Sequence, residues 1–573
     1  MVDFDKWVPK DGLKFDNKSS DIIKSNENIA VLAGPGAGKT EILAQKACFI
    51  LETELCVWPY NILSISRKRE SASNIKDRVS LRCGSVLSER FHSFTIEAFT
   101  KSIVDRFMYI LPKHEQPDEN YKIVFNPWDR SFPKALSFDD LTLTALKIVK
   151  ASSSLMKSIR ATYKYVFIDE FQDLNGHQYD FVKLLFCDTD SIVTVVGDTK
   201  QAIMKFANAL PDGFLKFELD FQAKLKVIYT NFRASPELKG FIDRIGYNWW
   251  PIEFGNPSAM SVNGSLDKED YSMLLFQDEK HEAVQLSLKI QHWINEKGIK
   301  PEEISVLFRV NTNSNYSKTI SQELLKLGIL SINESNVQDY LSEPVGKVLI
   351  ALLSLLTRTR DVNSWESLRD TYLYCRSGDN SNYEDYELNN ILEFISNNRY
   401  YNGGADKSFD ELLDSVVDFM NEFFYENLRN TWPQYRQGSF MEDTFHDLLN
   451  ELRDARLMSS SWAGAVDLIS GVGAVRMMTI HKSKGLEFIA VILVGLEDYS
   501  YFRRDFNQKK LDEERSTIFV ALSRAKSKLL ISCAQNRAHY GKSKFTHITS
   551  IINDLAQCGL SKQRVEKSEL LSL

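Results

Sequence analysis

Short apolar runs, each followed by a stretch with helical periodicity, recur along the first 230 residues of the chain. The candidate strands are Ile29–Leu32, Ile62–Ser66, Tyr165–Ile168, Ser191–Val196 and Lys226–Thr230. Runs that are apolar throughout, without alternation, are typical of strands buried on both faces. The pattern therefore predicts a parallel sheet with helices on both sides.

A second group of apolar runs follows later, at Ile304–Val310, Val475–Ile480, Phe488–Val494 and Leu529–Cys533. Two separate α/β cores are the simplest account of the two groups. We expect residues 1–100 and 161–225 to form the first core, and residues 226–342 and 464–573 the second. Residues 101–160 and 343–463 show mainly helical patterns and are predicted to be insertions.

Length and composition describe a globular, non-membrane protein. The 573 residues suffice for three or four domains of ~150 residues each. No apolar run approaches the ~18 residues that span a bilayer, and the acidic start Met-Val-Asp-Phe-Asp does not resemble a signal peptide. The seven cysteines are scattered and never spaced C-x-x-C. We therefore expect a cytoplasmic protein without zinc or an iron–sulfur cluster.

Charge is spread unevenly along the chain. The net charge of −7 argues against binding nucleic acid over the whole surface, but it leaves room for a basic cleft. Residues 471–530 contain 11 Lys and Arg against 7 Asp and Glu, which gives +4. Residues 361–460 contain 8 against 20, which gives −12.

A glycine-rich loop with the pattern A-x₄-G-K-T follows the first predicted strand. Gly34, Gly36 and Gly38 allow backbone N–H groups to point at phosphates, and the following helix adds positive potential at its N-terminus. Lys39 is expected to reach the β- and γ-phosphates, and the Thr40 hydroxyl to hold Mg²⁺.

Two adjacent acids, Asp169 and Glu170, end the apolar run Tyr165–Ile168. This position is the carboxyl edge of the predicted sheet, where open α/β folds bind ligands. We expect Asp169 to bind the water shell of the metal, and Glu170 to orient or deprotonate the attacking water. The cofactors predicted from the two segments are ATP and Mg²⁺.

Six segments occur in an order that resembles the motifs of UvrD/Rep/PcrA-type superfamily 1 helicases. They are Ala33–Thr40, Phe167–Asp173, Val195–Gln201, Asn231–Arg233, Thr479–Phe488 and Val520–Ala525. The resemblance covers nearly the whole chain. It implies two RecA-like cores with the nucleotide between them, and ATP-driven 3′-to-5′ movement along single-stranded DNA.

The same resemblance assigns roles around the nucleotide. It implies that Gln201 senses the γ-phosphate, Phe232 stacks on adenine, and Glu487 lies near the ribose. It also implies that Arg233 reaches the γ-phosphate and that Arg524 is an arginine finger contributed by the second core, so that hydrolysis requires closure of the cleft.

For DNA, the resemblance implies contacts from Phe91 and His92, base stacking by Phe206, and a contribution from His481. Stacking does not depend on base identity, which suits a translocating enzyme. Arg67, in the triplet Arg67-Lys68-Arg69, is a candidate for holding backbone phosphates, with a solvated loop as the alternative.

Several positions depart from the family pattern. No glutamine precedes Gln45 to read adenine, so a preference for ATP over other nucleotides does not follow from the sequence. Met204 and Ala207 replace an expected tyrosine and arginine, and Arg67 replaces a phenylalanine. We expect these changes to leave ATP hydrolysis intact and to weaken the grip on DNA.

The acidic insertion is poorly suited to contact DNA, because like charges repel and no counterions are released. It is predicted to face a protein or to act as an inhibitory lid, with a plain solvated bundle as the alternative. The compact chain is also similar to helicase subunits of Gabija-type anti-phage defence systems, which implies an OLD-type nuclease partner and DNA ends as substrate. The alternatives are a stand-alone DNA repair helicase and a regulatory subunit that senses nucleotides or DNA ends without unwinding.

Overall fold

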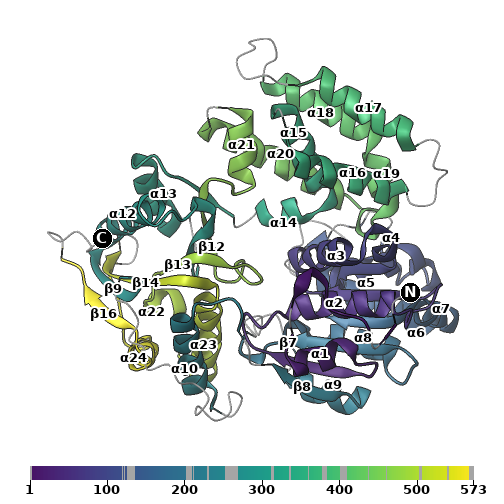
Figure 1. Ribbon diagram of the computed structural model, residues 1–573, viewed down its shortest axis with the longest axis horizontal. Coiled ribbons are helices and arrows are strands. Elements are labelled where there is room, and N and C mark those ends of the chain that lie inside the picture. The colour runs from purple at the N-terminus through teal and green to yellow at the C-terminus, as the bar shows by residue number, and fades with distance from the viewer. Residues whose placement is uncertain are drawn as a thin grey trace.

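The structure is a computed structural model that describes residues 3–4, 6–13, 15–118, 121, 123–124, 136–201, 210, 212–228, 231–251, 269–310, 315–334, 337–358, 360–376, 384–399, 409–436, 438–459, 461–502, 506–537 and 541–566. Two sheets of mainly parallel strands form two cores, and a helical unit stands above them (Figure 1). Among the described residues, no helix has the length and apolarity needed to cross a membrane.

The first core is a parallel sheet in the order β3-β2-β6-β7-β1-β8. Its strands are β1 (Ile29–Ala33), β2 (Asn61–Ser66), β3 (Phe91–Thr95), β6 (Tyr163–Ile168), β7 (Ile192–Gly197) and β8 (Lys224–Ile228). The predicted strands are present, although β8 begins and ends before the predicted bounds. The strand β3 was not predicted as one, because half-buried polar residues interrupt its apolar ones.

Helices cover both faces of this sheet, as the continuous apolar runs predict. One face packs against α1 (Asn17–Lys24), α2 (Lys39–Glu52) and α3 (Arg69–Cys83). The other packs against α5 (Ile96–Phe107), α6 (Phe138–Ala151), α7 (Ser153–Thr162), α8 (Gly176–Phe186) and α9 (Gly213–Phe221). Much of the predicted insertion 101–160 therefore belongs to this layer. The short strands β4 (Ile123–Val124) and β5 (Leu136–Ser137) pair beside it.

The second core is an eight-stranded sheet whose main path runs β11-β12-β10-β13-β14-β9-β16. The strands are β9 (Tyr271–Asp278), β10 (Ile304–Phe308), β11 (Leu330–Asn333), β12 (Ala474–Thr479), β13 (Phe488–Val494), β14 (Ala525–Arg537), β15 (Gly541–Lys542) and β16 (Ser561–Arg564). Helices α10 (Pro236–Trp249), α23 (Gln508–Leu522) and α24 (Thr549–Gln557) cover one face. Helices α12 (Glu279–Asn295) and α13 (Asn315–Lys326) cover the other.

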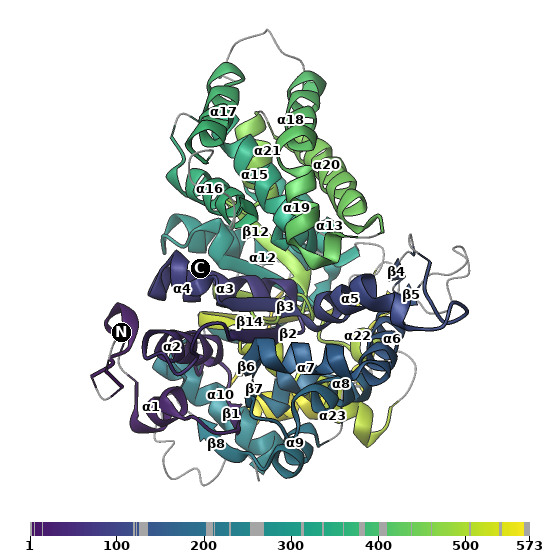
Figure 2. The same cartoon turned by 90° about the vertical axis from the view of Figure 1, so that its right-hand side faces the viewer.

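The helical unit between β11 and β12 has its own hydrophobic core. Its helices are α14 (Val337–Ser342), α15 (Pro344–Thr357), α16 (Val362–Arg376), α17 (Glu384–Asn397), α18 (Phe409–Phe423), α19 (Tyr425–Thr431), α20 (Phe440–Met458) and α21 (Trp462–Ile469). Because α14 and α21 share this core, the unit extends slightly beyond the predicted range 343–463 at both ends. Figure 2 shows it above both cores.

The helical unit also contacts the first core directly. Helix α14 lies against α3, and the turn Pro433–Tyr435 lies against α5. In addition, Lys347 Nζ on α15 lies 3.6 Å from Asp77 Oδ2 on α3. The first core is therefore held from two directions, by the second core and by the helical unit.

Candidate nucleotide site between the two cores

The glycine-rich loop connects β1 to α2, as predicted, and its backbone requires glycine. Gly36 and Gly38 have φ angles of 70° and 74°, in the left-handed region. A Cβ on Gly36 would also lie 2.3 Å from Asn231 Oδ1. The N–H of Phe232 donates to the Gly36 carbonyl at 2.9 Å, which attaches the Asn231–Arg233 segment to the loop. Lys39 begins α2, so the loop and the helix N-terminus together form an anion cradle.

Thr40 and Asp169 lie together and fit a magnesium site. The Thr40 hydroxyl donates to Asp169 Oδ2 at 3.3 Å, and Asp169 is buried. Burial, and then the charge of Glu170, raises the pKa of Asp169 to about 7. A hydroxyl and a carboxylate are oxygen ligands of the kind that Mg²⁺ takes together with water and phosphate. The described residues contain no cluster of three or more His, Cys, Asp or Glu that would hold a metal by themselves.

Glu170 follows directly and has an unusual backbone, with φ at 52°. Its Oε2 accepts a hydrogen bond from Gln172 Nε2 at 2.5 Å. Burial opposes ionisation, but the nearby ammonium groups of Lys484 and Lys39 outweigh it and lower the pKa of Glu170 to about 2. The residue is therefore an ionised carboxylate beside the metal ligand, the position in which a carboxylate orients water for attack on a phosphate.

Gln201 and Arg524 form a direct contact between the two cores. Gln201 follows β7 in the first core, and Arg524 lies between α23 and β14 in the second. Arg524 Nη2 donates to Gln201 Oε1 at 2.8 Å, while Gln201 Nε2 donates to Asp198 Oδ2 at 2.9 Å. Burial, and then the charge of Arg233, lowers the pKa of Arg524 to about 9, so it stays charged at neutral pH.

Arg233 makes a second contact with the other core. Its Nε donates to Glu487 Oε2 at 2.8 Å, and its Nη1 donates to the Ser523 carbonyl at 3.0 Å. Glu487 also pairs with Lys526 at 2.9 Å. Burial favours the neutral carboxyl group of Glu487, but the ion pairs with Lys526 and Arg233 outweigh burial and lower the pKa of Glu487. Phe232 beside this cluster is 63% exposed, which leaves its ring open for stacking on a base.

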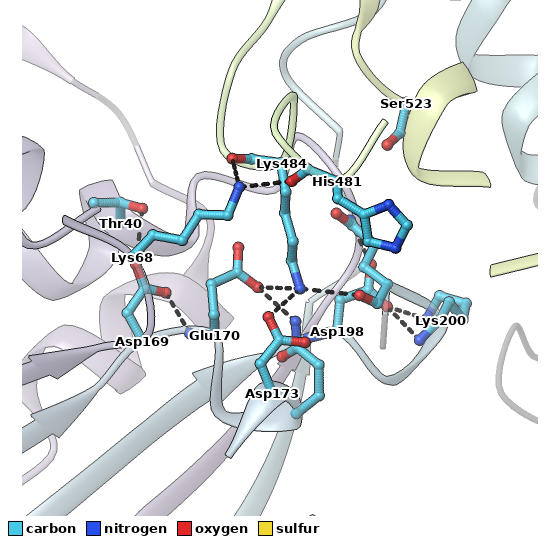
Figure 3. Close-up of polar contacts among 12 residues, drawn as sticks. Thr40, Lys68, Asp169, Glu170, Asp173, Asp198, Lys200, His481, Lys484 and Ser523 are labelled. Atoms are coloured by element: carbon cyan, nitrogen blue, oxygen red, sulfur yellow. Dashed lines mark hydrogen bonds and ion pairs between the residues drawn. The ribbon is translucent and has the colours of Figure 1, made fainter. Parts of the chain in front are cut away.

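Lys484 and Asp173 also belong to the site, although no role was predicted for them. Lys484 Nζ lies 2.5 Å from Asp173 Oδ2, 3.0 Å from the Gln201 carbonyl oxygen and 3.7 Å from Glu170 Oε2 (Figure 3). Burial alone would lower the pKa of Lys484. The carboxylates of Asp173 and Glu170 have the larger, opposite effect, so the pKa of Lys484 is raised. Both residues lie within motif segments that the sequence analysis identified, Thr479–Phe488 and Phe167–Asp173, and this was the signal that could have found them. Their contact was not predicted, because it joins positions far apart in the sequence.

Three of the predicted DNA contacts are engaged inside the protein. Phe91 on β3 is 1% exposed and packs 6.4 Å from the Phe167 ring, so it is a core residue, and its burial corrects the prediction of a base contact. His92 Nδ1 lies 3.1 Å from the Tyr163 hydroxyl, and burial lowers the pKa of His92 to about 4. It is a neutral ring packed against Tyr163, an arrangement that does not favour the predicted contact with DNA. Arg67 Nη1 pairs with Glu97 at 2.6 Å, which satisfies the charge that was expected to meet DNA.

Two further predictions concern the DNA track. Phe206 lies outside the described residues, as do Met204 and Ala207. His481 lies in the turn after β12, and its carbonyl accepts a hydrogen bond from Lys68 Nζ at 2.8 Å. The second core therefore contacts Lys68 of the first core through the backbone of His481.

Gln45, which was noted as the first glutamine of the chain, has a structural role. Its Oε1 accepts from the Lys10 N–H at 2.9 Å, and its Nε2 donates to Glu41 Oε1 at 3.0 Å. Gln45 thus fastens the N-terminal segment to α2 and is fully buried.

Comparisons with known proteins agree with this geometry. Residues 16–126 and 112–222 match the UvrD/REP helicase N-terminal domain, and residues 227–381 and 376–536 match the UvrD-like helicase C-terminal domain. The chain is 23% identical over 662 residues to the ATP-dependent DNA helicase PcrA of Staphylococcus epidermidis, covering 97% of this chain and 88% of that protein. It is 24% identical over 473 residues to DNA helicase II of Haemophilus influenzae, covering 74% of this chain and 62% of that protein.

Proposed function

The chain belongs to the UvrD/REP helicase family, a class of ATP-hydrolysing DNA helicases, and we propose that it uses ATP hydrolysis between its cores to move along single-stranded DNA. The observation that carries the proposal is the contact of Arg524 with Gln201, which supports a site built from both cores if Gln201 senses the γ-phosphate as proposed. A site shared by two bodies changes as they open and close, which is what coupling hydrolysis to movement requires.

Each side chain has a chemical task in this proposal. Lys39 and the loop amides bind the phosphates, and Glu170 orients the attacking water. Thr40 and Asp169 would hold Mg²⁺, which neutralises charge on the β- and γ-phosphates when it is bound. Arg524 and Arg233 stabilise the charge that develops in the transition state.

Single-stranded DNA is the proposed track, with movement from 3′ to 5′ as in the family. The burial of Phe91 and the packing of His92 reduce the number of available side-chain contacts in this arrangement. Fewer stacking contacts favour a weaker grip, since each stacked base contributes ~1–3 kcal/mol.

Strand displacement on tailed duplexes tests the proposal. Wild-type protein and Lys39→Ala are compared on duplexes with a 3′ tail, a 5′ tail or blunt ends, with ATP and Mg²⁺. Displacement of the 3′-tailed duplex by wild type alone supports an autonomous helicase. Displacement that prefers the 5′ tail, or that Lys39→Ala retains, contradicts the proposed direction or the proposed energy source.

A second proposal concerns a protein partner at the acidic helical unit. Helix α20 exposes Asp443, Asp447 and Asp454, and in its last turn it exposes Leu457 by 86%. Negative charge around an apolar anchor suits a basic protein surface better than it suits DNA. We propose that this face binds a nuclease of the OLD type in anti-phage defence.

Charge reversal tests the second proposal. Asp447→Lys with Asp454→Lys is expected to abolish copurification with a coexpressed nuclease of the OLD type, while DNA-stimulated ATPase activity is retained. Unchanged copurification contradicts a role for this face.

A further inference from the structure

Lys68 of the first core is held by the backbone of the second. Its Nζ donates to the carbonyl oxygens of His481 at 2.8 Å and Lys484 at 3.1 Å (Figure 3). It also donates to the Lys482 carbonyl at 3.4 Å. An ammonium group has three donors, so three converging carbonyls form a geometrically suitable cage for it. The cage fixes the turn after β12 against the first core.

The same turn places Lys484 on the carboxylates of the nucleotide site. While the Lys484 carbonyl accepts from Lys68, the Lys484 side chain runs to Asp173 at 2.5 Å and lies 3.7 Å from Glu170. One residue therefore contacts Lys68 through its backbone and the proposed water-orienting carboxylate through its side chain. Moving the turn would move the ammonium group away from Glu170.

We propose that Lys68 is a positioning residue that holds Lys484 against Glu170 and Asp173, so that ATP turnover stays low until DNA draws Lys68 away. The inference rests on the proposed function, in which Glu170 must be available to the attacking water. A carboxylate already engaged by an ammonium group is a weaker acceptor for that water.

A DNA phosphate has the chemistry needed to release Lys68. The residue lies just beyond the carboxyl end of β2, beside the position predicted to hold backbone phosphates. The carbonyl oxygens that hold it are neutral acceptors. The bonds from the charged ammonium to these carbonyls are already charge-assisted. An anionic phosphate adds the attraction between two opposite charges, which a neutral carbonyl oxygen does not offer, so it competes for the same ammonium.

Steady-state ATPase assays of Lys68→Met, with and without single-stranded DNA, test the proposal. The rate without DNA is expected to rise roughly five- to tenfold, as expected from losing one charge-assisted contact, while the KM for ATP stays within about twofold. The rate at saturating DNA is expected to change less than about twofold. Lys68→Arg, which keeps the charge and the donors, is expected to restore a slow DNA-free rate.

Lys347→Met is the matched control. It also removes a lysine that joins the first core to the rest of the chain, but its contacts are Asp77 and Ser73 on α3. It is expected to leave the DNA-free rate unchanged. An equal rise in Lys347→Met would assign the effect to general loosening and overturn the role of Lys68.

The outcomes separate this inference from the proposed function. If DNA stimulates the wild type but Lys68→Met hydrolyses ATP without DNA as slowly as the wild type, the inference fails and the function stands. If DNA does not stimulate the wild type, the proposed function fails, while a faster Lys68→Met still supports the restraint. Hydrogen exchange of the 481–486 amides gives a second readout: faster exchange in Lys68→Met supports the cage, and unchanged exchange contradicts it.

Discussion

Replacing Arg524 with alanine removes the clearest link between the two cores. Arg524 is 2% exposed and donates to Gln201 Oε1 at 2.8 Å, the Val520 carbonyl at 3.0 Å and the Leu486 carbonyl at 3.2 Å. With a pKa of about 9, its guanidinium keeps its charge at the pH of the assay. Its Nη2 also donates to the Ser523 hydroxyl at 2.9 Å. The substitution therefore removes a positioned cation as well as four hydrogen bonds.

The expected effect on turnover is large. An arginine that stabilises phosphoryl transfer contributes about 10³- to 10⁵-fold in kcat. Because Arg233 remains near the site, we expect the lower end for Arg524→Ala, about 10³-fold, which corresponds to ~4 kcal/mol of transition-state stabilisation. The KM for ATP is expected to change by less than about threefold, since the phosphate loop and Phe232 are intact.

A steady-state ATPase titration at saturating single-stranded DNA measures both constants. Arg524→Ala leaves the buried hydrogen-bond acceptors of Arg524 without their donor, which is expected to lower the free energy of unfolding by about 1–3 kcal/mol. Thermal unfolding therefore serves as the folding control. Arg524→Lys, which keeps the charge but has fewer donors, is expected to recover part of the rate. A fall in kcat of less than about tenfold, or a raised KM with unchanged kcat, would refute the role of Arg524.

Three further predictions concern the same site and its support. Glu170→Gln is expected to abolish turnover while retaining ATP, checked by filter binding of radiolabelled ATP; measurable turnover would contradict the role of Glu170. Phe91→Ala is expected to lower the free energy of unfolding by about 3–5 kcal/mol. If Phe91→Ala keeps a normal melting temperature and loses only DNA binding, Phe91 contacts DNA and is not a core residue. Because the pKa of Asp169 is raised to about 7, protons compete with Mg²⁺ below that pH. The Mg²⁺ concentration for half-maximal activity should therefore rise as pH falls from 8 to 6, and a flat profile would contradict the assignment.

The sequence predicted most of the first core because its strands are apolar throughout. It did not predict β3, whose half-buried histidine and serine interrupt the apolar pattern. Similarly, β16 (Ser561–Arg564) is polar along its length and becomes a strand only by pairing with β9. Edge strands depend on a partner more than on their own composition, so a single sequence signals them weakly.

The position of the glycine-rich loop between a strand and a helix was predictable from one local motif, while the nucleotide-binding roles of Lys39 and Thr40 stay predictions. Contacts between distant motifs were not predictable in the same way. Lys484 meets Asp173 across 311 positions, and the Lys68 contacts with the second core depend on backbone carbonyls. Arg67 illustrates the opposite error, because Glu97 on α5 neutralises a charge that looked available for DNA.

The central claim is that DNA controls ATP hydrolysis between the two cores. The most direct test is the steady-state rate of ATP hydrolysis by the wild-type protein, with Mg²⁺, in the absence and presence of saturating single-stranded DNA, with Lys39→Ala as the blank. We predict a slow rate without DNA and an increase of at least about tenfold with it, as expected if DNA shifts a closed and restrained site to an active one. A rate that single-stranded DNA leaves unchanged would contradict the account.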